Sequence, residues 1–376
     1  MAVLVVSSAN VDCGMIINVI SSPIGGGAEL LVRELHRIYL SQKLDSHVIY
    51  SVGDHYTQRQ NETVFGLNPR SPFNILKIRK VLKQLTHNKK SPCVVHIHLT
   101  WPFFYGTLAC LGLNNIKLIY TEHDTLNKRR NVPLLWIIER LFYSQYECIV
   151  CISDGVKKSL ENWVGSKISQ RLVTIPNGSR IYSLIERTAL EGRLPRLISV
   201  GSLSSKKNFT TTISAIALLR DEVESYTIIG EGPERPLLEK LIQEKKLENK
   251  VKLIGWSDEI EAHLHAADIQ LIPSLWEGFG LVAVEGMSTG LPVVASNVDG
   301  LREVIDESNP SVTLVNQPGS VNEWVTCIRV MVKNIYAIGL NKIAITSRQQ
   351  AEMFSLDEMA DHYLAIYLQV LSEQRH

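Results

Sequence analysis

Short apolar runs rich in β-branched residues alternate with longer amphipathic stretches along most of the chain. In residues 28–42 (AELLVRELHRIYLSQ) and 235–246 (RPLLEKLIQEKK) the apolar positions recur at the spacing of a helix face. Strands that alternate with helices in this way are typical of parallel sheets with helices on both faces. The pattern therefore predicts an α/β fold.

The predicted strands form two series, separated by the weakly patterned residues 179–195. The first series is 17–21, 47–52, 94–98, 117–122, 148–153 and 172–177, and the second is 196–201, 226–230, 251–255, 269–274 and 292–296. These two series predict two doubly wound, Rossmann-like domains. We expect a ligand cleft between them at the carboxyl ends of the strands. We place the first domain at 1–180, a linker at 181–195 and the second domain at 196–355. Residues 1–14 precede the first strand unit, which starts at Met15. They could form an extra strand or an upstream extension, and we expect them to make few contacts with either sheet; Met1 and Met15 both remain candidate starts.

Composition and charge support a soluble protein with two distinct halves. Of 376 residues, 45% are apolar and 20% charged, and no apolar run reaches the ~18 residues that a membrane span needs. The start of the chain lacks the basic region of a signal peptide, and six cysteines do not suggest a disulfide framework, so we expect a cytoplasmic protein. Residues 1–180 hold 21 Lys and Arg against 12 Asp and Glu, whereas the remainder holds 18 against 26. This asymmetry suggests different partners for the two domains.

Three glycine-containing turns lie where predicted strands lead into predicted helices. They are SSPIGGGAELL with Gly25, Gly26 and Gly27, VGSLSSKKNF with Lys206 and Lys207, and IIGEGPERP with Gly230 and Gly232. Glycine lets the backbone approach a ligand closely, and helix N-termini and lysines attract phosphate. The alternative is that the glycines serve only tight turns and the lysines are solvated.

The stretch WEGFGLVAVEG (276–286) holds two glutamates, Glu277 and Glu285, among glycines and apolar residues. We expect a helix to begin near Phe279 or Gly280, with Glu277 in the loop before it and Glu285 about a turn and a half inside. The amides of Phe279, Gly280 and Leu281 would then be free at the helix start. One short element could offer a carboxylate for hydroxyls, amides for phosphate and a second carboxylate for a diol.

Taken together, these motifs resemble those of the family-4 glycosyltransferases of GT-B fold. The likeness runs from about residue 15 to the C-terminus. The matching positions are the E-x7-E pair Glu277 and Glu285, the G-G-x-E turn at Gly26, Gly27 and Glu29, the G-x-L-x-x-x-K-N turn at Gly201, Leu203, Lys207 and Asn208, and IPNG (175–178), GEGP (230–233) and GLPVVAS (290–296).

The resemblance implies a retaining, metal-independent transfer of a hexose-type sugar from a nucleotide diphosphate, with no cofactor. Glu277 would contact the sugar, Lys207 and Lys206 the diphosphate, and Glu285 the ribose. Amides at Gly26, Gly27, Phe279, Gly280 and Leu281 would assist, while Gly232 and Ile254 frame the base and His123 lies near the sugar. The helix of residues 356–376 would cross back onto the first domain, as in the family.

One position departs from the family pattern, because Ser202 stands where an arginine is common. This keeps a second reading open, in which the chain binds a nucleotide sugar without catalysing transfer. A glycoside hydrolase is a third, since it also uses two carboxylates, about 5–9.5 Å apart. Glutamates eight residues apart, mostly along one helix, should be roughly 10 Å or more apart. His96, His98 and His123 could suggest a metal, but no carboxylate or cysteine pattern completes a ligand set.

Residues 70–90 form a basic amphipathic stretch with no acidic residue to counter it between Glu62 and Glu122. The apolar residues that could face the core are Phe73, Leu76, Val81, Leu82 and Leu85. The uncompensated basic residues are Arg70, Lys77, Arg79, Lys80, Lys83, Lys89 and Lys90. Such a stretch suits anionic lipid headgroups or a lipid-linked diphosphate acceptor, and the alternative is a solvated helix face. We therefore expect an enzyme of surface polysaccharide, lipopolysaccharide or capsule biosynthesis, associated peripherally with the inner membrane, and no nucleic-acid partner.

Overall fold

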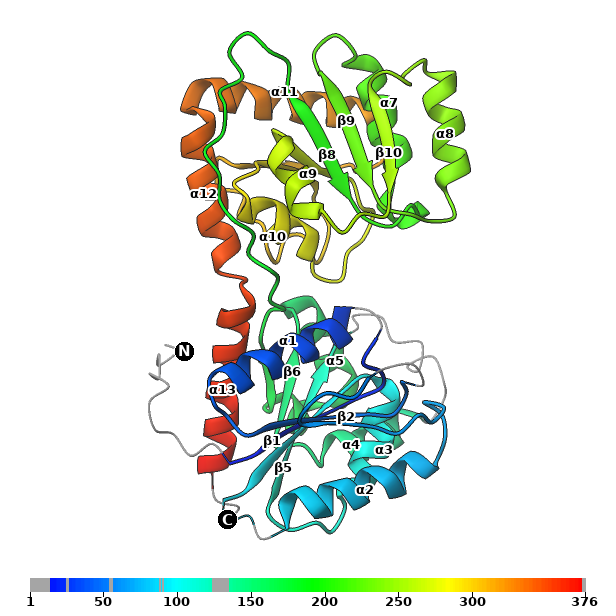
Figure 1. The fold of residues 1–376 in the computed structure, drawn as a ribbon, viewed down its shortest axis with the longest axis vertical. Helices are drawn as coiled ribbons and strands as arrows, with labels where there is room; N and C mark the ends of the chain where they lie inside the picture. The colour runs from blue at the N-terminus through cyan, green and yellow to red at the C-terminus, as the bar shows by residue number, and fades with distance from the viewer. Residues whose placement is uncertain are drawn as a thin grey trace. The chain divides into compact units, whose positions relative to one another are not determined.

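The structure is a computed structural model that describes residues 14–24, 27–53, 57–87, 89, 91–123 and 135–373. Its contacts divide the chain into two compact units (Figure 1). The first consists of Met1–Gly178 and Leu356–His376, and the second of Ser179–Ser355. Each unit holds one sheet in which every described strand pair is parallel. Both units are thus α/β, as the alternation of strands and helices predicts.

The first sheet has the strand order β3-β2-β1-β4-β5-β6-β7. Its strands are β1 (Ile16–Ile20), β2 (Ser46–Tyr50), β3 (Glu62–Val64), β4 (Cys93–His98), β5 (Ile116–Glu122), β6 (Cys148–Cys151) and β7 (Leu172–Thr174). The order reverses between β1 and β4, which marks the switch point where ligands of doubly wound folds bind.

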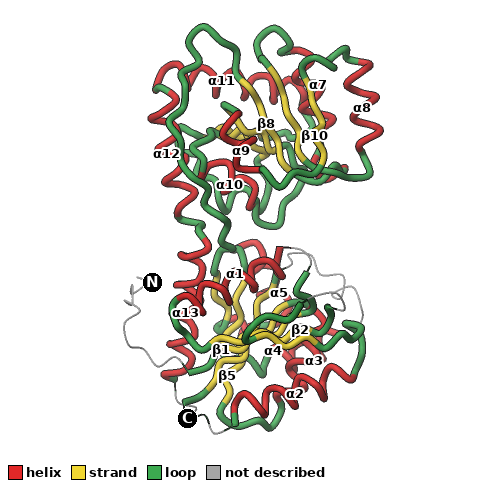
Figure 2. Tube along the Cα trace, viewed as in Figure 1, coloured by secondary structure: helices red, strands yellow, loops and turns green. Residues whose placement is uncertain are grey.

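Helices cover both faces of this sheet (Figure 2). They are α1 (Gly27–Ser41), α2 (Phe73–Thr86), α3 (Thr100–Cys110), α4 (Leu135–Tyr143), α5 (Asp154–Val164), the short α6 (Ser166–Ser169) and α13 (Leu356–Ser372). Successive residues of β1 show the alternation: Ile16 belongs to the same core cluster as Leu35 of α1, whereas Ile17 belongs to the cluster that contains Ile78 of α2. A strand with both faces covered needs apolar residues in succession, and β1 and β4 are fully buried.

The last helix of the chain, α13, belongs to the first unit. It packs against α1 and β4, and the Tyr39 hydroxyl donates to the Ala360 carbonyl at 3.2 Å. Tyr363 and Tyr367 of α13 are buried in the same cluster as Ile16 and Tyr39. The fold of the first unit is therefore completed by residues that lie some 180 positions away in the sequence.

The second sheet has the strand order β10-β9-β8-β11-β12-β13 and reverses between β8 and β11. Its strands are β8 (Arg196–Val200), β9 (Ser225–Ile229), β10 (Val251–Gly255), β11 (Ile269–Ile272), β12 (Val293–Ser296) and β13 (Val312–Val315). Its helices are the 3-10 turn η2 (Ser205–Lys207), α7 (Phe209–Leu218), α8 (Arg235–Glu244), α9 (Ile260–Ala266), α10 (Leu281–Ser288), α11 (Val321–Ile338) and α12 (Leu340–Glu352).

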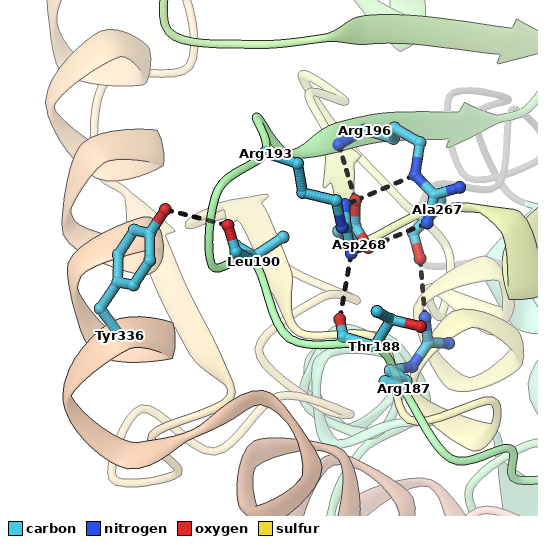
Figure 3. Close-up of polar contacts among 8 residues, drawn as sticks. All are labelled: Arg187, Thr188, Leu190, Arg193, Arg196, Ala267, Asp268 and Tyr336. Carbon is cyan, nitrogen blue, oxygen red and sulfur yellow. Dashed lines mark hydrogen bonds and ion pairs between the residues drawn. The ribbon is translucent and has the colours of Figure 1, made fainter.

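Residues 181–195, which the sequence pattern suggests as a linker, are anchored to the second unit (Figure 3). The buried Arg187 guanidinium donates to the carbonyls of Ala267 and Thr289, both at 2.7 Å. Arg193 donates to both carboxylate oxygens of Asp268, at 2.7 and 2.8 Å. The polar groups of this segment bond to side chains and to loop carbonyls instead of forming the backbone hydrogen bonds of a sheet, so the segment is irregular. It packs as part of the second unit.

All the predicted strands are present, with bounds that differ by at most three residues, and two further strands were missed. The missed ones, β3 and β13, are three and four residues long and lie at sheet edges. The expectation for two residues of α2 was wrong, because Phe73 and Leu76 are 64% and 65% exposed. Leu82 is buried as expected, together with Asn74 and Ile78. The expectation for residues 1–14 concerns a segment that, apart from Gly14, lies outside the described residues. Within the described part, none of the helices has the length and apolarity to cross a membrane.

Candidate functional site

A lysine and a glutamate meet at the switch point of the second sheet. Lys207 follows β8 in the turn η2, and Glu277 follows β11, the strand beside β8 where the order reverses. The Lys207 ammonium donates to Glu277 Oε1. The two loops are also joined by their backbones, because the Leu275 amide donates to the Lys206 carbonyl at 2.8 Å. The sheet topology thus brings together two residues that are seventy positions apart.

The Glu277 carboxylate is largely buried and surrounded by donors. Its side chain is 9% exposed, Ser274 Oγ donates to Oε1 at 2.6 Å, and Lys206 Nζ lies 3.6 Å from Oε2. Burial alone would raise the pKa of Glu277, but Lys207, Ser274 and Lys206 outweigh it and lower the pKa below its usual value. The carboxylate is therefore ionised at neutral pH, next to two cations that could meet a diphosphate.

Glu285 lies in α10, as the fifth of the eight residues of that helix. Burial raises its pKa to about 7, against an opposing effect of Arg180. The helix is preceded by Gly280, which has φ of 68° and whose added Cβ would come 2.8 Å from Leu301. A side chain there would be strained and crowded, so the loop into α10 depends on this glycine.

Phe279 and Leu281, predicted to bind the donor, flank this glycine and differ in exposure. The Phe279 ring is buried in a core cluster, 5.9 Å from the Phe354 ring between centroids. Its side chain therefore anchors the loop, and only its backbone can meet a ligand. Leu281 is half-buried at the first position of α10.

A cavity of about 400 Å³ lies at the carboxyl ends of β8, β9 and β10. Its lining includes Gly201, Ser202, Gly230, Glu231, Trp256 and Asp258, with Arg180 and Tyr182 at another side. The predicted Gly232 lies on the turn after β9 and the predicted Ile254 lies in β10, and neither is among the lining residues. An added Cβ on Gly232 would come 2.3 Å from the Leu203 carbonyl oxygen, so the close approach of two turns requires glycine here.

Several cavity residues escaped the sequence prediction. Trp256 and Asp258 follow β10, where the position after a strand end could have signalled them. Tyr182 lies in the segment taken for a linker and Arg180 lies just before it, and no sequence signal marks them. Ser274, which bonds to Glu277, lies in the PS pair that follows β11 and carried no predicted role.

The remaining predicted residues lie in the first unit. His123 follows β5, and its Nε2 is 3.5 Å from Nδ1 of the buried His98; burial lowers the pKa of His123 to about 4. His96 uses both ring nitrogens for protein hydroxyls, Tyr367 and Thr121, each at 2.7 Å. No group of three His, Cys, Asp or Glu side chains in the described ranges is arranged to hold a metal ion. Gly27 is the first residue of α1, and Gly26 lies outside the described residues.

Comparison with known proteins agrees with the fold and the motifs. Residues 25–179 match the model of Glycosyltransferase Family 4, and residues 183–335 match that of Glycosyl transferases group 1. The chain is 31% identical to a 2-deoxystreptamine glucosyltransferase of Streptomyces kanamyceticus over 68% of this chain and 69% of that protein. It is 28% identical to an uncharacterized 41.2 kDa protein in the cps region of Klebsiella pneumoniae, over 77% of this chain and 82% of the other.

Among solved structures, Anabaena HepE in complex with UDP superposes with a TM-score of 0.74 at 19% identity, covering 93% of this chain and 98% of that one. This likeness concerns the fold. The two family models, the curated glucosyltransferase and the pair of parallel sheets lead to one assignment: the chain belongs to the family-4 glycosyltransferases of GT-B fold.

Proposed function

We propose that this glycosyltransferase moves a hexose-type sugar from a nucleotide diphosphate to a glycan or lipid-linked oligosaccharide, with retention of configuration and without a metal ion. The observation that carries the proposal is the pairing of Lys207 with Glu277 at the switch point of the second sheet. The pairing places a buried, ionised carboxylate and two ammonium groups on one short surface.

The chemistry follows from these charges. Lys207 and Lys206, with the amides at the start of α10, would stabilise the negative charge that develops on the leaving diphosphate. Two fixed ammonium groups can supply the positive charge that a divalent metal supplies elsewhere, which supports metal independence. Glu277 would accept hydrogen bonds from sugar hydroxyls beside the developing oxocarbenium ion. The leaving diphosphate would help to take the proton of the acceptor hydroxyl on the same face.

The donor is proposed to be a nucleotide sugar because the cavity beside this pair has the size and lining for a nucleoside. Its volume of about 400 Å³ falls in the range of small-molecule pockets, roughly 300–1,000 Å³. Trp256, 79% exposed at the cavity, offers an aromatic face for a base. The complex of the structurally similar HepE with UDP supports the same donor class.

The acceptor is proposed to belong to surface polysaccharide biosynthesis. The support is the relative in the Klebsiella cps region, together with names such as lipopolysaccharide core biosynthesis and amylovoran biosynthesis glycosyltransferase among other relatives. A lipid-linked diphosphate would suit the basic first unit.

The test is a thermal-shift screen with UDP, GDP and their sugars, followed by transfer assays with the donor that raises the melting temperature. NMR of the product gives the anomeric configuration, and addition of EDTA tests metal independence. Release of sugar from a glycoside without any nucleotide would favour the hydrolase reading. Donor binding without transfer to any acceptor of a broad panel would favour a non-catalytic binding protein.

We also propose that the first unit contacts an anionic membrane through α2. Lys77, Lys80 and Lys83 are exposed on this helix, and Phe73 and Leu76 are exposed beside them. Exposed apolar side chains next to lysines suit the boundary between headgroups and acyl chains. Arg79 is committed elsewhere, because its guanidinium donates to the carbonyls of Ala109 and Leu111, at 2.9 and 2.6 Å.

A further inference from the structure

A chain of polar side chains crosses three neighbouring strands of the first sheet and ends at His123. It begins at Asn18 on β1 and continues through His98 on β4 to His123 after β5. His98 Nε2 lies 3.2 Å from Asn18 Oδ1, and His98 Nδ1 lies 3.5 Å from His123 Nε2. Asn18 and His98 are buried, so each hydrogen bond offsets the cost of removing a polar group from water.

The ring of His98 is held in place by a second histidine. His96 lies two residues earlier on the same face of β4, and the centroids of the two rings are 3.9 Å apart. His96 is itself fixed by hydroxyls on both nitrogens, from Tyr367 of α13 and Thr121 of β5. The Thr121 hydroxyl lies 3.1 Å from that of Tyr363, so two tyrosines of the last helix support the stack.

The hydrogen-bond roles along this chain follow from the Asn18 amide. Its Oδ1 can only accept, so His98 must carry its proton on Nε2. Burial lowers the pKa of His98 well below its usual value, so the ring is neutral and its Nδ1 has a lone pair. His123 Nε2 must then donate to that lone pair. Because burial also keeps His123 neutral, its Nδ1 is left as a hydrogen-bond acceptor.

The nitrogen of the Asn18 amide supports a role for the oxygen as the acceptor from His98. Asn18 Nδ2 is buried and has no hydrogen-bond partner in the part of the chain that the structure describes. A buried donor without a partner is costly. A purely structural position would favour an apolar residue here, since β1 otherwise consists of Ile and Val.

We propose that Asn18 and His98 are positioning residues that hold His123 as the neutral Nε2–H tautomer, with Nδ1 ready to accept from a hydroxyl of a sugar substrate. The tautomer is a property of the protein alone, whereas its use rests on the proposed transferase function. The specific consequence is that His123 acts toward the sugar hydroxyl as a hydrogen-bond acceptor and not as a donor or a cation.

The test is NMR of protein labelled with ¹⁵N-histidine at pH 7, because the two tautomers give different ring nitrogen shifts and couplings. The signals of His123 are assigned by their loss in His123→Gln. We expect a protonated Nε2 and an unprotonated Nδ1 in the wild type. An Nδ1–H tautomer of His123 would mean that the oxygen and nitrogen of the Asn18 amide are exchanged. Either that tautomer or a cationic His123 ring in the wild type would overturn the proposal.

Variants then test the connection. Asn18→Leu removes the acceptor and should shift His123 to a mixture of tautomers, whereas Asn18→Asp keeps an acceptor oxygen and should retain the Nε2–H form. His36→Gln changes another buried histidine of the same unit, which lies 2.8 Å from Ser46 Oγ, and should leave the His123 signals unchanged. An unchanged His123 in folded Asn18→Leu would also overturn the proposal.

Kinetics separates this inference from the proposed function. With an active donor, Asn18→Leu should lower kcat about tenfold, the scale of one hydrogen bond, and change the donor KM little. Asn18→Asp should recover most of that loss. If no nucleotide sugar is turned over but the tautomer is as expected, the proposed function fails and the assignment of hydrogen-bond roles stands.

Discussion

The ammonium group of Lys207 and the carboxylate of Glu277 form an ion pair where the strand order of the second sheet reverses. Neither residue is near the other in sequence, and each follows a strand whose carboxyl end faces the same edge. Lys206 and Ser274 complete the surroundings of the carboxylate. These charges are the basis for proposing that a sugar diphosphate binds at this pair.

Changing Glu277 to Gln should lower kcat on the order of 10²-fold, since it removes a charge whose effect is greatest in the transition state. Lys207→Met should lower kcat similarly and raise the pKa of Glu277, because a cation next to the carboxylate is lost. In steady-state kinetics, the loss of transition-state stabilisation in the double variant should be smaller than the sum of the losses in the two single variants. Lys240→Met removes an exposed lysine 3.7 Å from Glu244 and serves as the control; an equal loss in that control would contradict a specific role for the pair.

Glu285 predicts a pH dependence of donor binding. Its pKa of about 7 means that the carboxylate is only partly ionised at neutral pH. If the ionised form accepts from the ribose diol, the donor KM should fall as pH rises through about 7 and then level off. Glu285→Gln should have a higher KM with little pH dependence in this range. A KM profile unchanged by the substitution would show that another group titrates.

The same shift has a consequence for stability. The folded pKa of Glu285 lies above its ordinary value, so the folded state binds the proton more tightly than the unfolded state. The resulting stabilisation is complete below the ordinary pKa and is lost as pH rises through about 7. Measured by denaturant unfolding, the wild type should therefore lose stability relative to Glu285→Gln across this window. A constant difference between the two proteins would refute the assignment.

Asp268 holds residues 181–195 to the second unit, and its loss should destabilise that unit. The carboxylate is almost fully buried and accepts from Arg193 and Arg196. Burial opposes ionisation, but these hydrogen bonds lower the pKa of Asp268 overall. Its contribution is present above its ordinary pKa and is lost as pH falls through the lowered value.

Asp268→Asn should cost about 2–3 kcal/mol of unfolding free energy, the scale of charge-assisted hydrogen bonds, because both arginine partners are partly exposed. The exposed pair of Glu222 and Arg329 provides a matched control at 2.6 Å. Glu222→Gln should cost no more than about 1 kcal/mol. Similar losses in the two variants, measured by denaturant unfolding at neutral pH, would mean that Asp268 does not anchor the segment.

The sequence allowed the fold class and most strands to be predicted because local alternation specifies them. Glu277, Lys207 and Gly232 could be singled out because they lie on turns after strands, where ligand sites gather. The exposure of Phe73 could not, since the face that α2 buries depends on the neighbouring α3. Likewise, the chain from Asn18 to His123 and the anchoring of Arg187 depend on packing between distant segments, which no local pattern encodes.

Gly232→Ala should disturb the turn beside the cavity. Its Cβ would come 2.3 Å from the Leu203 carbonyl oxygen, a backbone atom that cannot rotate away. We expect a lower melting temperature and a raised donor KM, because the turn must move away from β8. Gly319→Ala is the control, since no atom lies within 4 Å of the added Cβ. If both variants bind the donor like the wild type, the close packing of the turns is not needed for binding.

Membrane binding by α2 should depend on its lysines and on salt. Each basic residue near an anionic surface contributes about 1 kcal/mol, and salt screens this attraction within a Debye length of ~8 Å at physiological ionic strength. The exposed Phe73 and Leu76 add an apolar contribution that salt does not weaken. Changing Lys77, Lys80 and Lys83 together to Gln should therefore reduce cosedimentation with anionic vesicles by about 10²-fold or more.

The companion variant Phe73→Ser with Leu76→Ser should weaken binding more evenly across salt concentrations. As a matched control, Lys240, Lys245 and Lys246 of the second unit are changed together to Gln, which removes the same charge far from α2 in sequence. This control should bind vesicles like the wild type, and the α2 variants should turn over a short soluble acceptor normally. If the wild type and the α2 lysine variant bind anionic vesicles equally, the lysines of α2 do not contribute to membrane binding. The helix would then be an ordinary solvated helix.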